Sequence, residues 1–194
     1  MPNWCENNFT VTFPKEHGDM ARKLVEAFNT NALLQFLKPM PDELDDPDLS
    51  TFGGDNAELC ENKRRSMFAK YGYPSWYEWR LSNWGTKWDI NTKDIDPLEV
   101  SVHEDGSVTV QGYFDSAWSP PVEAFAELRK IEGIVFSLYY YEPGSSFCGC
   151  TDQDEDEYFG IDQQTPSWVE SNIPQHIIDN FDLANRYEEE PCQE

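Results

Sequence analysis

The stretch LEVSVHEDGSVTVQGYF, residues 98–114, carries the clearest fold signal in the chain. Apolar and polar residues alternate on both sides of Asp105-Gly106, a pair that favours a tight turn between antiparallel strands. The alternating apolar residues are Leu98, Val100, Val102, Val108 and Val110. This pattern predicts a β-hairpin.

The segments on either side of this hairpin extend the same sheet. NFTVTF, residues 8–13, alternates apolar and polar residues and predicts the first strand, and helical spacing predicts a helix over 16–29. After the hairpin, Ser119 is a suitable helix cap, and the apolar stripe that follows it ends at Gly133. IVFSLYYYEP, residues 134–143, predicts a further strand.

Six other segments complete the expected order. A second strand is predicted at LLQFLKPMP (residues 33–41), a buried helix at PSWYEWRLSNWG (74–85) and a short strand at TKWDI (86–90). Edge strands are predicted at SSFCGC (145–150) and EYFGI (157–161), and a final amphipathic helix at PQHIIDNFDLANRYEEE (174–190). Gly85 suits the end of the buried helix, because glycine adopts the left-handed conformation without penalty. The order predicts an α+β fold, a ferredoxin-like sandwich with a mostly antiparallel sheet and helices on one face.

Composition divides the chain unevenly. Residues 1–160 hold the predicted ferredoxin-like domain, with an insertion at about 42–72 that contains a helix around 57–70 and the basic cluster Lys63-Arg64-Arg65. Residues 161–194 form an expected acidic helical extension, which together with the insertion completes the fold prediction.

Net charge limits the partners. The chain has 37 acidic and 14 basic residues, a formal charge of −23, which repels nucleic acid and anionic membranes and attracts basic proteins. An acidic surface also serves plain solubility. With no apolar run near the ~20 residues that span a bilayer and no signal peptide at its start, the protein is expected in the cytoplasm of a bacterial host.

A candidate acidic partner surface follows from this charge. From residue 152 to the end there are 13 acidic residues and one basic residue. The predicted surface consists of Asp152, Asp154, Glu155, Asp156, Glu157, Glu188, Glu189 and Glu190.

A second candidate site lies around the Gly85 turn. Tryptophans combined with convergent polar groups are typical of small-ligand pockets and of protein interfaces, although filling of the core is an equally ordinary use. The candidate groove comprises Asn83, Trp84, Thr86, Lys87, Trp88, Asp89, Trp118 and Ser119. Of the tryptophans, Trp76 and Trp79 are expected inside and Trp84, Trp88 and Trp118 nearer the rim.

Catalytic and metal motifs are incomplete. Five cysteines without an export signal indicate reduced thiols, and Cys148-Gly-Cys150 lacks a second ligand pair for zinc. The acidic run after residue 151 has calcium-loop spacing, but Glu157 and Gln163 replace the required glycine and glutamate. No nucleophile is paired with a histidine by a known motif. We therefore predict no metal, cofactor or catalytic residue, with an enzyme of unrecognised type left as an alternative.

Several stretches carry a family resemblance. These are MPNWCENNFTVTF, FLKPMPDEL, WYEWRLSNWGTKWD, FDSAWSPPVEAFAEL and SLYYYEPG, residues 1–13, 36–44, 76–89, 114–128 and 137–144. In this order they resemble the YubB-type ferredoxin-like family, a set of small proteins encoded by bacteriophages and conjugative plasmids, over residues 1 to about 160. The resemblance implies a ferredoxin-like fold and a mobile-element origin, and it implies no reaction and no catalytic residues.

Two functions are consistent with these features. The first is a phage- or plasmid-encoded accessory protein that inhibits a host defence or nucleic-acid-binding protein by binding its basic surface, in the limit as a mimic of nucleic acid, without binding nucleic acid or membrane itself. The alternative is a binder of a small molecule or signalling nucleotide, a sponge that uses the aromatic groove.

Overall fold

The computed structural model describes residues 3–50, 57–93 and 95–188. Its helices and strands are β1 Trp4–Phe13, α1 Gly18–Asn29, α2 Leu33–Leu37, α3 Ala57–Tyr71, α4 Trp76–Asn83, β2 Glu99–Val102, β3 Val108–Ala117, α5 Val122–Phe125, β4 Val135–Glu142, β5 Phe147–Asp152, β6 Asp156–Gly160, α6 Pro166–Asn172, α7 Gln175–Phe181 and α8 Leu183–Glu188. Short 3-10 helices cover Lys15–His17, Asp42–Asp45, Pro47–Ser50 and Ala126–Lys130. None of these helices has the length and apolar character needed to cross a membrane.

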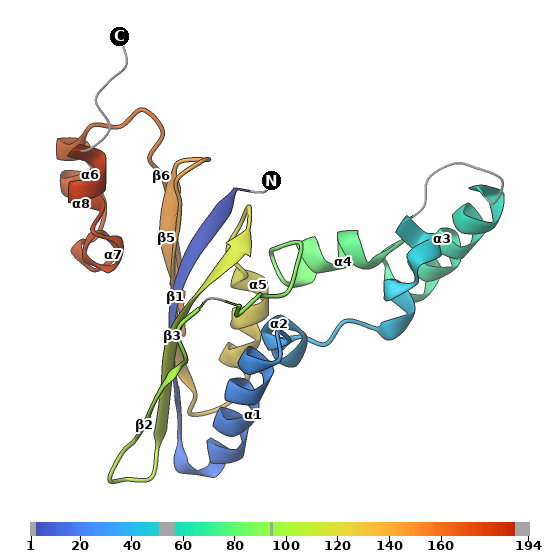
Figure 1. The fold of residues 1–194 in the computed structure, drawn as a ribbon, viewed down its shortest axis with the longest axis horizontal. Coiled ribbons are helices and arrows are strands. Elements are labelled where there is room, and N and C mark those ends of the chain that lie inside the picture. The colour runs from blue at the N-terminus through green and yellow to red at the C-terminus, as the bar shows by residue number, and fades with distance from the viewer. Residues whose placement is uncertain (1–2, 51–56, 94, 189–194) are drawn as a thin grey trace.

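The strands form one sheet in the order β2-β3-β1-β4-β5-β6 (Figure 1). Every neighbouring pair is antiparallel, and β3 lies between β1 and β2, as in a split βαβ unit. The elements β1, α1, β2, β3, α5 and β4 therefore make the ferredoxin-like α+β fold that the sequence predicts, and β5 and β6 widen it. The predicted 98–114 hairpin is confirmed, with Val102 opposite Val108.

The main core lies between the sheet and the helices that follow β1 and β3. Alternate residues of β1 point into it, because successive side chains of a strand face opposite sides. Phe9, Val11 and Phe13 are all buried, and the Phe9 ring contacts the rings of Phe114 and Phe125. Burying each such side chain stabilises the fold by about 1.5–3 kcal/mol.

The other face of the sheet is partly covered by the C-terminal helices. Figure 1 shows α6, α7 and α8 on the opposite side of the sheet from α1 and α5. Ile177, Ile178 and Phe181 of α7 are buried in a second core with Tyr141 and Cys148 of the sheet. The predicted amphipathic character of residues 174–190 is thus confirmed for α7. The prediction of one continuous helix is wrong, because Asp182 takes a left-handed conformation, with a φ of 53°, and separates α7 from α8.

Two predicted strands are wrong. Residues 33–41 contain α2, because Leu33, Leu34 and Leu37 follow helical spacing and all three are buried in the core. Residues 86–90 contain no strand; Asp89 instead accepts hydrogen bonds from the backbone N–H groups at the start of α2. Short apolar runs are ambiguous between helix and strand, and tertiary contacts decide.

The predicted helix in the insertion is confirmed as α3, which Figure 1 shows projecting away from the sheet. Basic residues of α3 pair with acidic residues from the preceding segment. Lys63 contacts Asp46 and Asp48, and Lys70 contacts Glu43. Arg65 contacts Glu61 of α3 and Arg64 contacts Glu78 of α4, so each residue of the basic cluster has an acidic partner.

Candidate functional site

The Gly85 turn brings α4 against the segment after β3. Gly85 has a φ of +87°, and its carbonyl accepts a hydrogen bond from the Ser119 hydroxyl. A Cβ atom at this position would lie 2.8 Å from the Pro120 carbonyl oxygen. Glycine is thus required twice here, for its backbone conformation and for the close approach of the two segments.

Two residues of the predicted groove are buried instead. Trp84 is 1% exposed, and its indole N–H donates to the Lys38 carbonyl at 2.8 Å. Thr86 is 0% exposed, and its hydroxyl donates to the Ala117 carbonyl. The expectation that Trp84 lies near the rim is therefore wrong, because its ring packs edge-on against Trp79 inside the core.

Two more groove residues have structural partners. Asp89 accepts hydrogen bonds from the backbone N–H groups of Leu34, Gln35 and Ile90, and burial raises the pKa of its carboxyl group. Asn83 donates to the Trp79 carbonyl one turn earlier in α4. These side chains hold the local backbone, so neither is directed at a ligand.

The remaining members form an exposed aromatic cluster around one ammonium group. The Lys87 Nζ atom lies 5.5, 4.7 and 5.3 Å from the ring centroids of Tyr77, Trp88 and Trp118, respectively. Trp88 and Trp118 are 37% and 42% exposed, as predicted for the rim, whereas no sequence pattern pointed to Tyr77. Trp118 has a φ of 64°, a strained conformation for an aromatic residue. The chain's own lysine thus lies where a cationic ligand would contact these rings.

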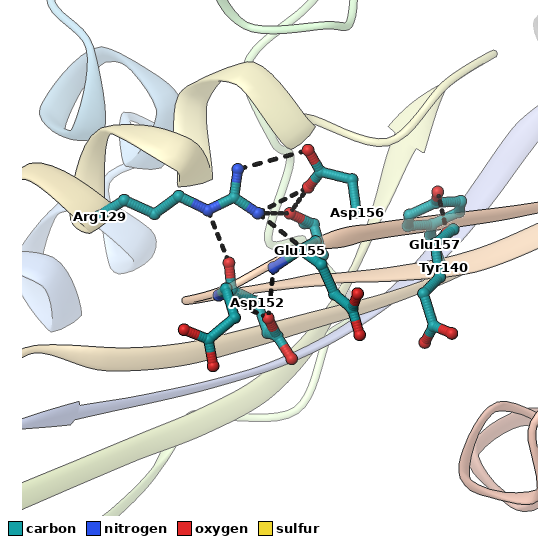
Figure 2. Close-up of polar contacts among 8 residues, drawn as sticks. Arg129, Tyr140, Asp152, Glu155, Asp156 and Glu157 are labelled. Carbon is teal, nitrogen blue, oxygen red and sulfur yellow. Dashed lines mark hydrogen bonds and ion pairs between the residues drawn. The ribbon is translucent and has the colours of Figure 1, made fainter.

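The acidic surface centres on the turn between β5 and β6, and an arginine organises it. Figure 2 shows the Arg129 guanidinium reaching into this turn. It donates to the carbonyls of Asp152 and Glu155 at 2.7 and 3.0 Å and to the Asp156 carboxylate at 2.7 Å. Its hydrogen bond holds the pKa of the Asp156 carboxyl below the ordinary value. No sequence pattern points to Arg129, which precedes the turn by more than twenty residues.

The other predicted acidic residues divide into bonded and free side chains. The Asp152 carboxylate accepts from two backbone N–H groups of its own turn, and Glu157 lies 3.3 Å from His176 of α7. Asp154 and Glu155 are exposed. Glu188 is the last residue of α8, and Glu189 and Glu190 lie outside the described residues.

Replacing Arg129 by methionine is expected to destabilise the β5–β6 turn by about 1–3 kcal/mol, because several hydrogen bonds to a charged group are lost. Amide hydrogen exchange at residues 151–157 measures this. A depressed carboxyl pKa stabilises the fold above the ordinary value of 3.8, and that contribution disappears as pH falls through the folded value. The variant should therefore lose less stability than the wild type between about pH 5 and pH 2; an unchanged acid profile would contradict the pairing.

Charge is segregated between the two parts of the chain. Residues 1–93 hold 14 acidic and 11 basic residues, whereas residues 94–194 hold 23 acidic and three basic residues. Those three bases are paired within the chain, Arg129 with Asp156, Lys130 with Glu127 and Arg186 with Glu6. Residues 94–194 supply β2 to β6, α5 and α6 to α8, so most of the excess negative charge is carried by this second part of the chain.

Two neighbouring hollows lie on the sheet face that carries α7. The first encloses about 430 Å³ between α7 and the segment before β2, and the second, also about 430 Å³, lies beside the start of β1. Tyr113 lines both hollows. No sequence motif marks this face, because its residues are single polar side chains spread over several elements.

Two buried cysteines lie on β5. Cys148 and Cys150 point to the same side of β5 and pack under the C-terminal helices, where burial raises the pKa of each thiol to about 12. Within residues 3–50, 57–93 and 95–188, no group of three or more potential metal ligands is found. The absence of a metal, a cofactor and a catalytic residue stays a prediction.

Residues 84–167 match the family model described as the ferredoxin-like domain in Api92-like protein. No curated protein matches the chain. Among solved structures, the crystal structure of a protein Api92 from Yersinia pseudotuberculosis matches 82% of this chain and 98% of its own chain, with 11% identity and a TM-score of 0.42. Neither match bears the YubB-type name, so that resemblance stays a prediction. Over residues 84–167 the chain is similar to the ferredoxin-like domain of Api92-like proteins, and its fold is the ferredoxin-like α+β sandwich.

Proposed function

We propose that this protein acts by binding, and that the acidic residues of its second part, residues 94–194, engage the basic surface of a host protein. In the form that the resemblance favours, a phage- or plasmid-encoded protein inhibits a host defence or nucleic-acid-binding protein. Where that partner normally holds nucleic acid, the carboxylates occupy the place of phosphates. The observation that supports this most is the charge segregation, with 23 acidic and three basic residues after position 93.

The three basic residues of this part of the chain are already paired with carboxylates. Since Arg129, Lys130 and Arg186 already contact carboxylates of this chain, none of them supplies an uncommitted charge to neutralise the remaining acidic residues. Exposed carboxylates of this kind speed the encounter with a basic partner and disfavour acidic ones. Such attraction is expected to weaken strongly with salt.

The small-molecule alternative has less support from the geometry. Trp84 and Thr86 are buried, so they cannot line an open groove for a nucleotide. Lys87 is covered by three rings, which leaves it poorly placed to receive a phosphate. The exposed Trp88 and Trp118 rings are better suited to contact a cation or an apolar group.

Displacement of DNA from a purified basic nucleoid protein of a host bacterium tests the proposal. We expect the chain to release labelled DNA at 50 mM salt. The effect should be lost as the salt concentration is raised toward about 0.5 M, where the screening length is only a few ångströms. Fluorescence anisotropy of the DNA gives the concentration for half release. No release at 50 mM salt would refute the proposal for this class of partner.

A matched pair of variants locates the effect. Each variant removes four exposed carboxylates. The first variant changes residues 94–194 and combines Asp96→Asn, Glu99→Gln, Asp154→Asn and Glu155→Gln. The second variant changes residues 1–93 and combines Glu16→Gln, Glu26→Gln, Asp42→Asn and Glu58→Gln. The first is expected to raise the half-release concentration about tenfold, the second about twofold. Equal changes would mean that only total charge matters.

A further inference from the structure

The uncovered part of the sheet face has an ordered set of side chains. In the register of the sheet, Tyr113 of β3, Asn8 of β1 and Tyr139 of β4 lie side by side across three strands. Two residues further along β1, Thr10 lies beside Gln111, which in turn lies beside Glu99 of β2. All of these point to one face, because alternate residues of a strand share a side.

This face is hollowed. The first cavity, of about 430 Å³, has these residues as its floor, Asn180 of α7 on one side and Asp96 and Pro97 on the other. Asn180 accepts a hydrogen bond from the Asn8 amide at 2.7 Å, which fixes that side of the cavity to the sheet. Beyond Tyr113, the second cavity continues along the strands toward Glu6 and Asp115. The two hollows together make a groove, here called the sheet groove.

The groove has a consistent chemistry. Its charged lining residues are all carboxylates, Asp96 and Glu99 in the first hollow and Glu6, Asp115 and Glu142 in the second. Arg186 is bound to Glu6 at 2.7 Å and lies over the Tyr141 ring. The Tyr113 hydroxyl donates to Asp115, and burial raises the pKa of Tyr113, so the phenol stays neutral. The groove therefore combines negative charge, aromatic surface and amide groups.

We propose that the sheet groove binds an extended basic segment of a partner protein, with an arginine side chain against the Tyr113 ring and its guanidinium directed to Glu99 or Asp115. This rests on the proposed function and names where and by what chemistry the basic partner is recognised. Arginine fits better than lysine, because its planar guanidinium stacks on rings and bonds to two carboxylate oxygens at once. The amides of Asn8, Gln111 and Asn180 offer donors and acceptors to the peptide backbone.

A blocked tetra-arginine peptide is the probe, with binding to the full chain measured by calorimetry and amide chemical shifts at 50 mM salt. Shifts are expected at residues 8–10, 111–113 and 180. Asp96→Asn with Glu99→Gln should weaken binding about tenfold, and Tyr113→Ala should reduce the preference for tetra-arginine over tetra-lysine. The Glu99→Gln change keeps an oxygen that accepts the bond from Gln111, so the fold is retained.

The control is Asp154→Asn with Glu155→Gln, which removes the same charge from the β5–β6 turn and should weaken binding by about twofold or less. Equal weakening by both pairs of substitutions, or chemical shift changes confined to the β5–β6 turn, would show that the sheet groove is not the binding site. Either result would still be compatible with a basic partner. If neither tetra-arginine nor the nucleoid protein binds at 50 mM salt, the groove and the proposed function both fail.

Discussion

Replacing Trp84 by alanine is expected to lower the free energy of unfolding by about 3–5 kcal/mol, the usual range for removing a large buried aromatic side chain. The ring is 1% exposed, packs on Trp79, and has the Arg80 guanidinium 4.9 Å from its centroid. Its loss leaves a cavity and also leaves the Lys38 carbonyl without its donor. Urea unfolding followed by circular dichroism gives the value.

Trp88→Ala is the matched control, because Trp88 lies four residues away and is 37% exposed. We expect it to cost about 1 kcal/mol or less, mainly through its contacts with Lys87 and Trp118. Similar losses for both variants would mean that Trp84 is not a core residue. The comparison separates a structural from a binding role within one short segment.

Replacing Gly85 by alanine is expected to cost about 2–5 kcal/mol. A left-handed backbone costs a residue with a Cβ atom about 1–2 kcal/mol, and overpacking adds about 1–3 kcal/mol. The added atom would lie 2.8 Å from the Pro120 carbonyl oxygen, which belongs to backbone and moves only with its segment. Because Ser119 also bonds to the Gly85 carbonyl, the Lys87 aromatic cluster should lose order as well.

Gly72→Ala isolates the two contributions. Gly72 has a φ of +79°, close to that of Gly85, but no atom lies within 4 Å of its added Cβ position. We expect a loss of about 1–2 kcal/mol from conformation alone. If Gly85→Ala lowers the free energy of unfolding in urea no more than Gly72→Ala does, the close approach to Pro120 does not contribute to the destabilisation.

Local patterns in the chain were sufficient for much of the fold. The Asp105-Gly106 turn with valines alternating on either side predicts β2 and β3, and NFTVTF predicts β1, each confirmed by the pairing of the strands. The strand predicted at residues 33–41 is wrong, because Leu33 and Leu34 are adjacent in an apolar run that fits either a strand or one helical turn. Asp89, more than fifty residues later, caps that turn and settles it as helix.

The candidate sites were less predictable. Trp88 and Trp118 are exposed as expected, but residue type alone did not distinguish them from the buried Trp84. Arg129 organises the acidic turn from a helix in another part of the chain. No spacing rule connects such residues, because side chains that meet across a fold share no period in the sequence.

The amino-acid sequence alone determined the periodicity of the main strands and helices, the large negative charge and its excess toward the C-terminus, because each depends only on residues and their neighbours. The tertiary structure alone decided which tryptophans are buried, which carboxylates are paired, and that Tyr113, Asn8 and Tyr139 line one groove. Burial and ion pairing depend on what packs against a side chain, and here those neighbours come from segments up to 180 residues apart, as for Glu6 and Arg186.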